Sequence, residues 1–234
     1  MHIQDHFSGK RILLTGATGF LGKTILEKLL WAVPGIEKVY LLVRPAEGSA
    51  PARLRARSRL YEGLRTSPAF ERLRRRHGDI ASVLDRKTEV IPCDLMQEDL
   101  GIAPEDLRNI QAGLDTVIHV AAQVSWDERF DYSVRVNALA SRRLLSTVAA
   151  ISPPPQFVHI SSAYVHGQRT GRVFEAPFDP NTSIANEQGS SEPFDLEAEI
   201  SRALAHADRV EAQSLEEEIT ATLAKDAQLQ ADPR

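Results

Sequence analysis

Three glycines at a three-residue spacing, directly behind a short apolar run, constrain this chain more than any other feature. Ile12–Leu14 is an unbroken apolar run, which is typical of a strand buried on both faces of a parallel sheet. Gly16, Gly19 and Gly22 follow, and an amphipathic segment begins at once behind them. A strand, a glycine turn and a helix in this order place a pyrophosphate on the free N–H groups of a helix N-terminus. The alternative is a turn that only joins a strand to a helix, and the complete strand–turn–helix context favours a nucleotide.

Each glycine of this turn has a predicted purpose. Gly16 permits the tight turn, Gly19 lets the backbone approach a phosphate, and Gly22 lets the helix pack closely on the strand. The helix behind the turn is predicted to be amphipathic. Its apolar face is expected to hold Leu21, Ile25, Leu26, Leu29 and Leu30, and its polar face Lys23, Thr24, Glu27 and Lys28.

Further apolar segments alternate with helical patterns along the chain. They predict strands at 38–43, 89–93, 116–120 and 157–162, and a helix from about 132 to 150. This alternation predicts an α/β protein with a Rossmann-type doubly wound parallel sheet, incomplete at its C-terminal end. His119, inside the fourth strand, is interpreted as a packed strand histidine rather than a base.

Arg44, at the end of the second predicted strand, indicates which dinucleotide the turn takes. An acidic residue at this place binds the ribose 2′-hydroxyl of NAD, whereas an arginine accommodates the 2′-phosphate of NADP. No acid stands at the strand end, and Glu47 comes three residues late. The alternative is a solvated arginine beside a turn. Position and residue type together predict NADPH as the cofactor.

A basic arm occupies residues 53–76, where nine arginines stand against two glutamates. Apolar residues run through it at helix-like spacings, so the ordinary interpretation is a solvated helical face. The sharper hypothesis is a cationic rim for a phosphate-rich substrate such as coenzyme A.

Composition excludes several other classes of protein. A formal net charge of −4 gives no reason to expect a nucleic-acid partner. Cys93 is the single cysteine and cannot form an internal disulfide, which favours the cytoplasm. The sequence shows no signal peptide, no apolar run of the ~20 residues that span a membrane, and no metal-ligand cluster. A peripheral membrane contact is left open.

The character of the sequence changes beyond Gly167. Residues 175–193 are rich in Pro, Asn, Ser and Glu and are predicted to form a loop, and 194–229 have an acidic helical pattern. We therefore expect an NADP-binding Rossmann domain at 1–180 and an acidic helical segment at 181–234.

Residues 15–22 resemble the signature of the extended short-chain dehydrogenases/reductases. Taken together, residues 8–180 resemble the N-terminal part of the alcohol-forming fatty acyl-CoA reductases, the male-sterility branch of that superfamily. The motifs that carry the resemblance are Thr15–Gly22, Leu41–Pro45, the insertion with Phe70–Leu73, Cys93–Leu95, Leu100–Ile102, Val117–Ala122, Asn137 and Ile160–Val165. Cys93 and Ala140 are mild departures, because glycine is common at both places in the family.

The resemblance implies a role for each matching position. The residues implied to hold NADPH are Thr15, Gly16, Thr18, Gly19, Phe20, Leu21, Gly22 and Arg44, with Asp94 and Leu95 at the adenine, and Val120, Ala121 and Ala122 at the ribose. Asn137 is implied to support the helix beside the nicotinamide, and Ser161 to lie beside the cofactor. Ser162 matches the catalytic Ser/Thr that hydrogen-bonds the substrate carbonyl. The implied activity is NADPH-dependent reduction of a fatty acyl-CoA thioester to an aldehyde or fatty alcohol.

One departure from the family pattern is serious. The family needs a Tyr-x-x-x-Lys pair after the fifth strand, in which tyrosine is the general acid and lysine shifts its pKa. Tyr164 is followed by Gln168 at that spacing, no tyrosine follows it, and Lys225 has Ala221 four positions earlier. The family resemblance also implies that the acidic segment at 181–234 is an insertion ahead of a catalytic and substrate region that this sequence lacks. We therefore expect a fragment that is inactive by itself. A thioester reductase domain acting on carrier-bound acyl chains and a non-catalytic NADP-binding regulator are the alternatives.

Overall fold

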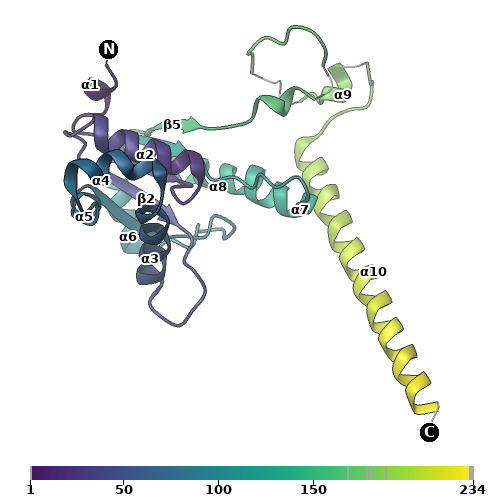
Figure 1. Ribbon diagram of the computed structural model, residues 1–234. Coiled ribbons are helices and arrows are strands. Elements are labelled where there is room, and N and C mark those ends of the chain that lie inside the picture. Colours follow the sequence, from purple (N-terminus) through teal and green to yellow (C-terminus); the bar gives the residue numbers. More distant parts are fainter. Residues whose placement is uncertain (1, 168, 178, 180, 188, 232–234) are drawn as a thin grey trace. The chain divides into compact units, whose positions relative to one another are not determined.

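The computed structural model describes residues 2–167, 169–177, 179, 181–187 and 189–231 (Figure 1). Its contacts divide the chain into two compact units. The first comprises residues 1–128 and 135–161, and the second comprises 129–134 and 162–234. One boundary between these units falls at 161–162, and the division expected at 180 stays a prediction. The chain leaves the sheet after its fifth strand, whereas its composition changes only later.

The first unit is built on a parallel sheet with strand order β3-β2-β1-β4-β5. The strands are β1 Arg11–Thr15, β2 Lys38–Val43, β3 Thr88–Pro92, β4 Thr116–His119 and β5 Gln156–His159. The predicted Rossmann-type sheet is thereby confirmed. The order reverses between β1 and β4, and ligands of such sheets bind at the carboxyl ends of the strands at this reversal.

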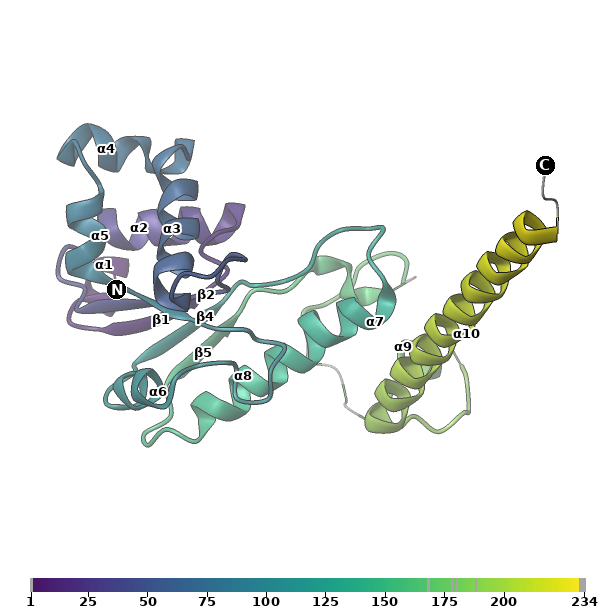
Figure 2. The same cartoon turned by 90° about the horizontal axis from the view of Figure 1, so that it is seen from below.

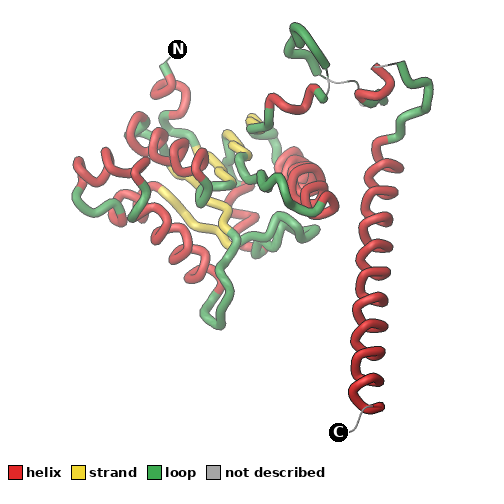
Figure 3. The backbone as a smooth tube through the Cα atoms, turned by 45° about the vertical axis from the view of Figure 1, so that its right-hand side comes forward, coloured by secondary structure: helices red, strands yellow, loops and turns green. Residues whose placement is uncertain are grey.

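Helices cover both faces of this sheet (Figures 2 and 3). The first face carries α2 Phe20–Ala32, α3 Ala52–Arg65, η1 Pro68–Phe70, α4 Glu71–His77 and α5 Ala81–Lys87, and the other carries α6 Pro104–Gln111 and α8 Ala140–Ala149. A short helix, α1 Ile3–Phe7, precedes β1. Side chains of β1 alternate between the two cores, since Ile12 and Leu14 join the first core and Leu13 the second. The apolar run is unbroken because both sides of the strand are buried.

Two predicted strand ends are corrected. The strand expected at 116–120 ends at His119, and the strand expected at 157–162 ends at His159. After His119 the next two backbone N–H groups donate to the Thr15 side chain instead of a neighbouring strand. Val120, Ser161 and Ser162 consequently lie in the segments that follow the strands.

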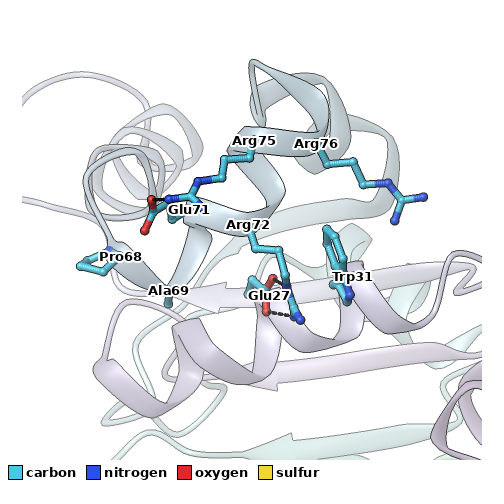
Figure 4. A pocket seen from close by; sticks show the side chains of 8 residues that line it. All are labelled: Glu27, Trp31, Pro68, Ala69, Glu71, Arg72, Arg75 and Arg76. Atoms are coloured by element: carbon cyan, nitrogen blue, oxygen red, sulfur yellow. Dashed lines mark hydrogen bonds and ion pairs between the residues drawn. The ribbon is translucent and has the colours of Figure 1, made fainter.

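The insertion between β2 and β3 is held on α2 by a charged pair that the helical pattern did not reveal (Figure 4). Glu27 was expected on the polar face of α2, but it is buried and accepts two hydrogen bonds from Arg72, at 3.0 and 2.9 Å. Arg72 and Arg76 also approach the ring of Trp31, at 4.2 and 5.1 Å from its centroid. Leu21, expected on the apolar face, is 42% exposed.

Most arginines of the basic arm have structural partners. Seven of the nine guanidinium groups donate hydrogen bonds to described residues, namely those of Arg53, Arg55, Arg57, Arg59, Arg72, Arg74 and Arg75. Arg53, for example, binds the buried carboxylate of Asp106 at 2.5 Å and the carbonyl of Val90 at 2.9 Å. Arg53 ties the insertion to β3 and α6 and Arg72 ties it to α2, whereas the other five bond within the segment between β2 and β3. The hypothesis of a cationic rim for coenzyme A stays a prediction.

The helix expected at about 132–150 has three parts. It runs through α7 Phe130–Ser133, the π-helical η2 Val134–Leu139 and α8. The apolar periodicity of the sequence does not distinguish a π-helical turn from an α-helical one. Such turns are frequent at functional sites, and this one carries Asn137.

The second unit contains η3 Ala163–His166, α9 Ile184–Glu187 and the long helix α10 Leu196–Ala231, in addition to α7. The predicted acidic helix is thereby confirmed with nearly the expected ends. Arg129, at the start of α7, pairs with Glu211 of α10 at 2.9 Å.

Candidate cofactor site

The glycine turn packs so tightly that two of its glycines have no room for a side chain. Gly16 has a φ of +73°, and a Cβ placed on it would lie 2.8 Å from the backbone nitrogen of Ala121. A Cβ on Gly22 would lie 2.1 Å from the carbonyl oxygen of Gly16. A Cβ on Gly19 would lie 3.3 Å from that oxygen, a tight but tolerable distance. The roles expected for Gly16 in turning and for Gly22 in close packing agree with this geometry.

The start of α2 offers backbone donors to an anion. Gly19 caps the helix without a side-chain hydrogen bond, and the first turn contains no acidic residue. Among the described residues, no acceptor pairs with the backbone N–H groups of Phe20, Leu21 or Gly22. Three open N–H groups beside a glycine turn fit a pyrophosphate, because helix N-termini favour negative charge.

Thr15 ties the glycine turn to the loop that follows β4. Its side chain is buried, and its Oγ1 accepts hydrogen bonds from the backbone nitrogens of Val120 and Ala121, both at 3.0 Å. Thr15 therefore shapes the site from below, as a support for the backbone that approaches Gly16. Thr18 lies in the turn between these glycines.

Asn137 holds the other end of the same loop. Its Oδ1 accepts from the backbone nitrogen of Gln123 at 2.8 Å, and its Nδ2 donates to the carbonyl of Gln123 at 2.9 Å. The segment from Val120 to Gln123 is thus fixed at both ends, with the small side chains of Ala121 and Ala122 between them.

Arg44 follows β2, and Asp94 and Leu95 follow β3, at the same carboxyl edge of the sheet as the glycine turn. The guanidinium of Arg44 is exposed and makes no hydrogen bond or ion pair with the described residues. Asp94 stabilises its own turn by accepting from the backbone nitrogen of Met96 at 3.0 Å. Leu95 packs against the second core. Arg44 is therefore available to a ligand, whereas Asp94 has a structural task as well.

His119 is fully buried between these elements. Its Nδ1 lies 2.7 Å from Thr15 Oγ1, and its Nε2 lies 2.9 Å from Ser141 Oγ. Burial, together with the neighbouring His159, lowers the pKa of His119 to about 4. A neutral, hydrogen-bonded imidazole agrees with the interpretation of a packed strand histidine.

Ser161 is the last residue of the first unit, and Ser162 belongs to the second. Both are exposed. Ser162 lines a hollow of about 670 Å³ within the second unit, together with Ala163, Val165, Val173, Phe174, Glu175, Ala176 and Pro177. The expected carbonyl-binding serine therefore borders a largely apolar surface.

The sequence profile of the family described as male sterility protein matches residues 14–228. The chain belongs to this family. The Arabidopsis thaliana protein named probable fatty acyl-CoA reductase 5 is 35% identical to it over 194 residues, 82% of this chain and 38% of the relative. Fatty acyl-CoA reductase 1 of Mus musculus is 35% identical over 185 residues, 78% of this chain and 34% of that protein. The chain thus spans little more than a third of the length of these relatives.

A solved structure supports the same fold. The reductase domain of PhqB from Penicillium fellutanum is 29% identical, with a TM-score of 0.51 over 71% of this chain and 40% of its own. The male sterility family and this neighbour establish a Rossmann-like domain of a family that takes a nicotinamide cofactor. In the described parts of the chain, no helix combines the length and apolarity needed to cross a membrane. The described residues also contain no group of side chains suited to a metal ion.

Ser141 is a residue of the candidate cofactor site that the sequence analysis did not identify. Its hydroxyl bridges His119 and the carbonyl of Asn137, the latter at 2.7 Å. The only signal in the sequence is its spacing, because a hydroxyl four residues after Asn137 lies on the same helical face.

Proposed function

We propose that this chain binds NADPH and supplies the cofactor half of the active site of a fatty acyl-CoA reductase. The carrying observation is the backbone cradle, in which Gly16 and Gly22 exclude side chains and the first turn of α2 keeps its N–H groups open. Relatives named fatty acyl-CoA reductases support the substrate class. When bound, NADPH supplies the hydride that reduces the thioester carbonyl.

The residues of this chain divide the work of binding. The N–H groups of Phe20, Leu21 and Gly22 take the pyrophosphate. Arg44 takes the 2′-phosphate, because its guanidinium is exposed and lacks a hydrogen-bonding partner among the described residues. Ala121 and Ala122 leave the backbone bare for the ribose, and Ser161 lies beside the cofactor. Asp94 and Leu95 border the adenine.

Ser162 orients the substrate carbonyl in this proposal by donating one hydrogen bond to its oxygen. The apolar side chains around it, among them Val173 and Phe174, suit the part of an acyl chain nearest the thioester. We place the protein in the cytoplasm, since Cys93 is a buried free thiol. Sedimentation with lipid vesicles tests whether the protein also contacts a membrane surface, which supplies acyl chains.

The test of the cofactor is a fluorescence titration of wild type and Arg44→Ala with NADPH and NADH. We expect wild type to prefer NADPH and the variant to lose roughly 10- to 150-fold of its NADPH affinity, because a charge-assisted contact is worth about 1.5–3 kcal/mol. Arg65→Ala is the matched control, since Arg65 is exposed on the same insertion and ends α3. Equal affinity of the wild type for both cofactors contradicts the proposed role of Arg44.

A second candidate is a thioester reductase that acts on carrier-bound acyl chains. The similarity to the reductase domain of a non-ribosomal peptide synthetase from Mycobacterium tuberculosis, 25% identical with a TM-score of 0.54, favours it. Two binding measurements on the NADPH complex separate the two candidate functions. One uses a long-chain acyl-CoA, and the other uses the same acyl group on a phosphopantetheine carrier protein. Tighter binding of the carrier-linked chain supports the second candidate. Binding of neither substrate favours a non-catalytic NADP-binding regulator.

A further inference from the structure

A continuous chain of hydrogen bonds runs beneath the candidate cofactor site through four elements. It begins at Thr15 of β1, passes through His119 of β4 and Ser141 of α8, and ends at the carbonyl of Asn137 in η2. The successive distances are 2.7, 2.9 and 2.7 Å. Thr15 and His119 are 1% and 0% exposed, so water does not compete for the first contact.

The donors and acceptors of this chain allow one arrangement of protons. Thr15 Oγ1 already accepts from the backbone nitrogens of Val120 and Ala121, which occupies both of its lone pairs. Its own proton must therefore go to Nδ1 of His119, and that nitrogen carries no proton. His119 is then protonated on Nε2, which donates to Ser141, and Ser141 donates to the carbonyl of Asn137.

We propose that His119 is a positioning residue of the cofactor site, which holds the loop from Val120 to Gln123 in place by orienting the hydroxyls of Thr15 and Ser141. The inference rests on the proposed binding of NADPH. At one end of the loop, Thr15 can receive two backbone N–H groups only while His119 takes its proton. At the other end, Asn137 clamps Gln123, and Ser141 fixes the turn that presents Asn137.

Small displacements of this loop matter because the glycine turn touches it. A Cβ on Gly16 would lie 2.8 and 2.9 Å from backbone atoms of Ala121 and Val120, so the two backbones are already in close contact. A loop that is no longer held by Thr15 and Asn137 therefore moves against the glycine turn, which is proposed to bind the pyrophosphate. Thus His119, although buried beneath the site, controls its shape.

The surroundings of His119 favour the neutral ring that this arrangement requires. From β5, His159 stacks on it with ring centroids 5.3 Å apart, and Phe157 lies at 6.2 Å. β1 and α8 present only hydroxyl groups to it. His159 is therefore the one titratable neighbour among the described residues that contact the ring.

Three substitutions separate the two hydrogen bonds of the ring. His119→Asn places an oxygen where Nδ1 stood and keeps an acceptor for Thr15. His119→Gln places a nitrogen near Nε2 and keeps a donor to Ser141, and His119→Phe removes both. Val117→Ala is the matched control, because Val117 is a buried residue of the same strand that belongs to the second core.

Each variant is measured for NADPH affinity, for unfolding by urea, and for amide hydrogen exchange of Val120 and Ala121 without cofactor. We expect His119→Gln and His119→Phe to bind NADPH about 3- to 10-fold more weakly, as the loss of one hydrogen bond predicts, and to exchange both amides faster. His119→Asn should exchange the amides of Val120 and Ala121 at the wild-type rate, because it keeps the acceptor for Thr15, and its NADPH affinity should fall less than that of His119→Phe. Val117→Ala should lower stability without changing the affinity or the exchange of these two amides. In wild type, ¹⁵N NMR should show the ring protonated on Nε2 alone.

The outcomes are distinguishable. If His119→Phe leaves the amide exchange and the NADPH affinity unchanged, the positioning role is overturned. It is also overturned if Val117→Ala, at equal stability, loses as much NADPH affinity and amide protection as the His119 variants. A ring protonated on Nδ1 overturns it as well. A wild type that does not bind NADPH, with amides that still exchange faster in His119→Phe, refutes the proposed cofactor and keeps the structural hold of His119 on the loop.

Discussion

At the scale of single residues, the turn leaves different amounts of room at two of its glycines. Gly22→Ala would place a methyl group 2.1 Å from the carbonyl oxygen of Gly16, whereas Gly19→Ala would place one at 3.3 Å. We expect Gly22→Ala to lower the free energy of unfolding by about 1–3 kcal/mol, even though alanine favours a helix by about 1 kcal/mol. Gly19→Ala should cost under about 1 kcal/mol. Urea denaturation followed by circular dichroism measures both, and equal losses would show that the helix can shift away from the turn.

The pKa of His119 makes stability depend on pH. This pKa is lowered to about 4, against about 6.5 in the unfolded chain. Between pH 6.5 and 4, His119 therefore binds a proton in the unfolded state but largely not in the folded state. The free energy of unfolding consequently falls as pH falls. We expect a loss of about 3 kcal/mol between pH 6.5 and 4 that His119→Asn lacks. The measurement is urea denaturation of both proteins across this range, and parallel losses would mean that other groups carry the pH dependence.

At the scale of elements, the insertion depends on one charged pair. Arg72→Ala leaves the carboxylate of Glu27 buried without its partner, and we expect a loss of about 1–3 kcal/mol of stability, discounted because Arg72 is half exposed. Arg75→Ala, which removes an exposed pair with Glu71 from the same helix, should cost under about 1 kcal/mol. Thermal and urea unfolding compare the two. Adding Glu27→Gln to Arg72→Ala should recover part of the loss, and no recovery would point to the lost contact with Trp31 instead.

The elements also show what the sequence could and could not predict. Short apolar segments between helical patterns predicted all five strands, and the unbroken run at Ile12–Leu14 reflects an interior strand that is buried on both faces. Glu27 was misplaced because its partner Arg72 lies 45 residues away, and helical periodicity contains no such information. The π-helical turn around Asn137 was missed for a similar reason, since its apolar spacing resembles that of an α-helix. At the site, the places of the glycines and of Arg44 at the carboxyl edge of the sheet could be predicted because they belong to local motifs. The links from Thr15 through His119 to Ser141 could not, because only the fold brings those residues together.

At the scale of the whole molecule, the two units have different tasks in the proposed function. The first contains the predicted cofactor cradle, from the glycine turn to Asn137, and the second contains Ser162. Cofactor affinity should therefore respond to residues of the first unit alone. Ser162→Ala should leave the dissociation constant of NADPH within about twofold of wild type, since Ser162 is proposed to bind the substrate carbonyl. Fluorescence titration checks this, and a larger change would assign Ser162 to the cofactor.

The last prediction concerns turnover. Hydride transfer to a thioester places negative charge on the carbonyl oxygen, and in residues 1–234 only Ser162 is proposed to hold it. No Tyr-x-x-x-Lys pair occurs in the sequence. General acid catalysis contributes about 10²- to 10⁴-fold, or ~3–5 kcal/mol of the barrier. We therefore expect the chain to bind NADPH but to oxidise it with a long-chain acyl-CoA at least about 100-fold more slowly than a relative with the pair. The measurement is NADPH absorbance over time, with Ser162→Ala as the comparison. Turnover as fast as that of such a relative would mean that another group in this chain donates the proton. Ser162 would then not be the only polar group that acts on the carbonyl oxygen.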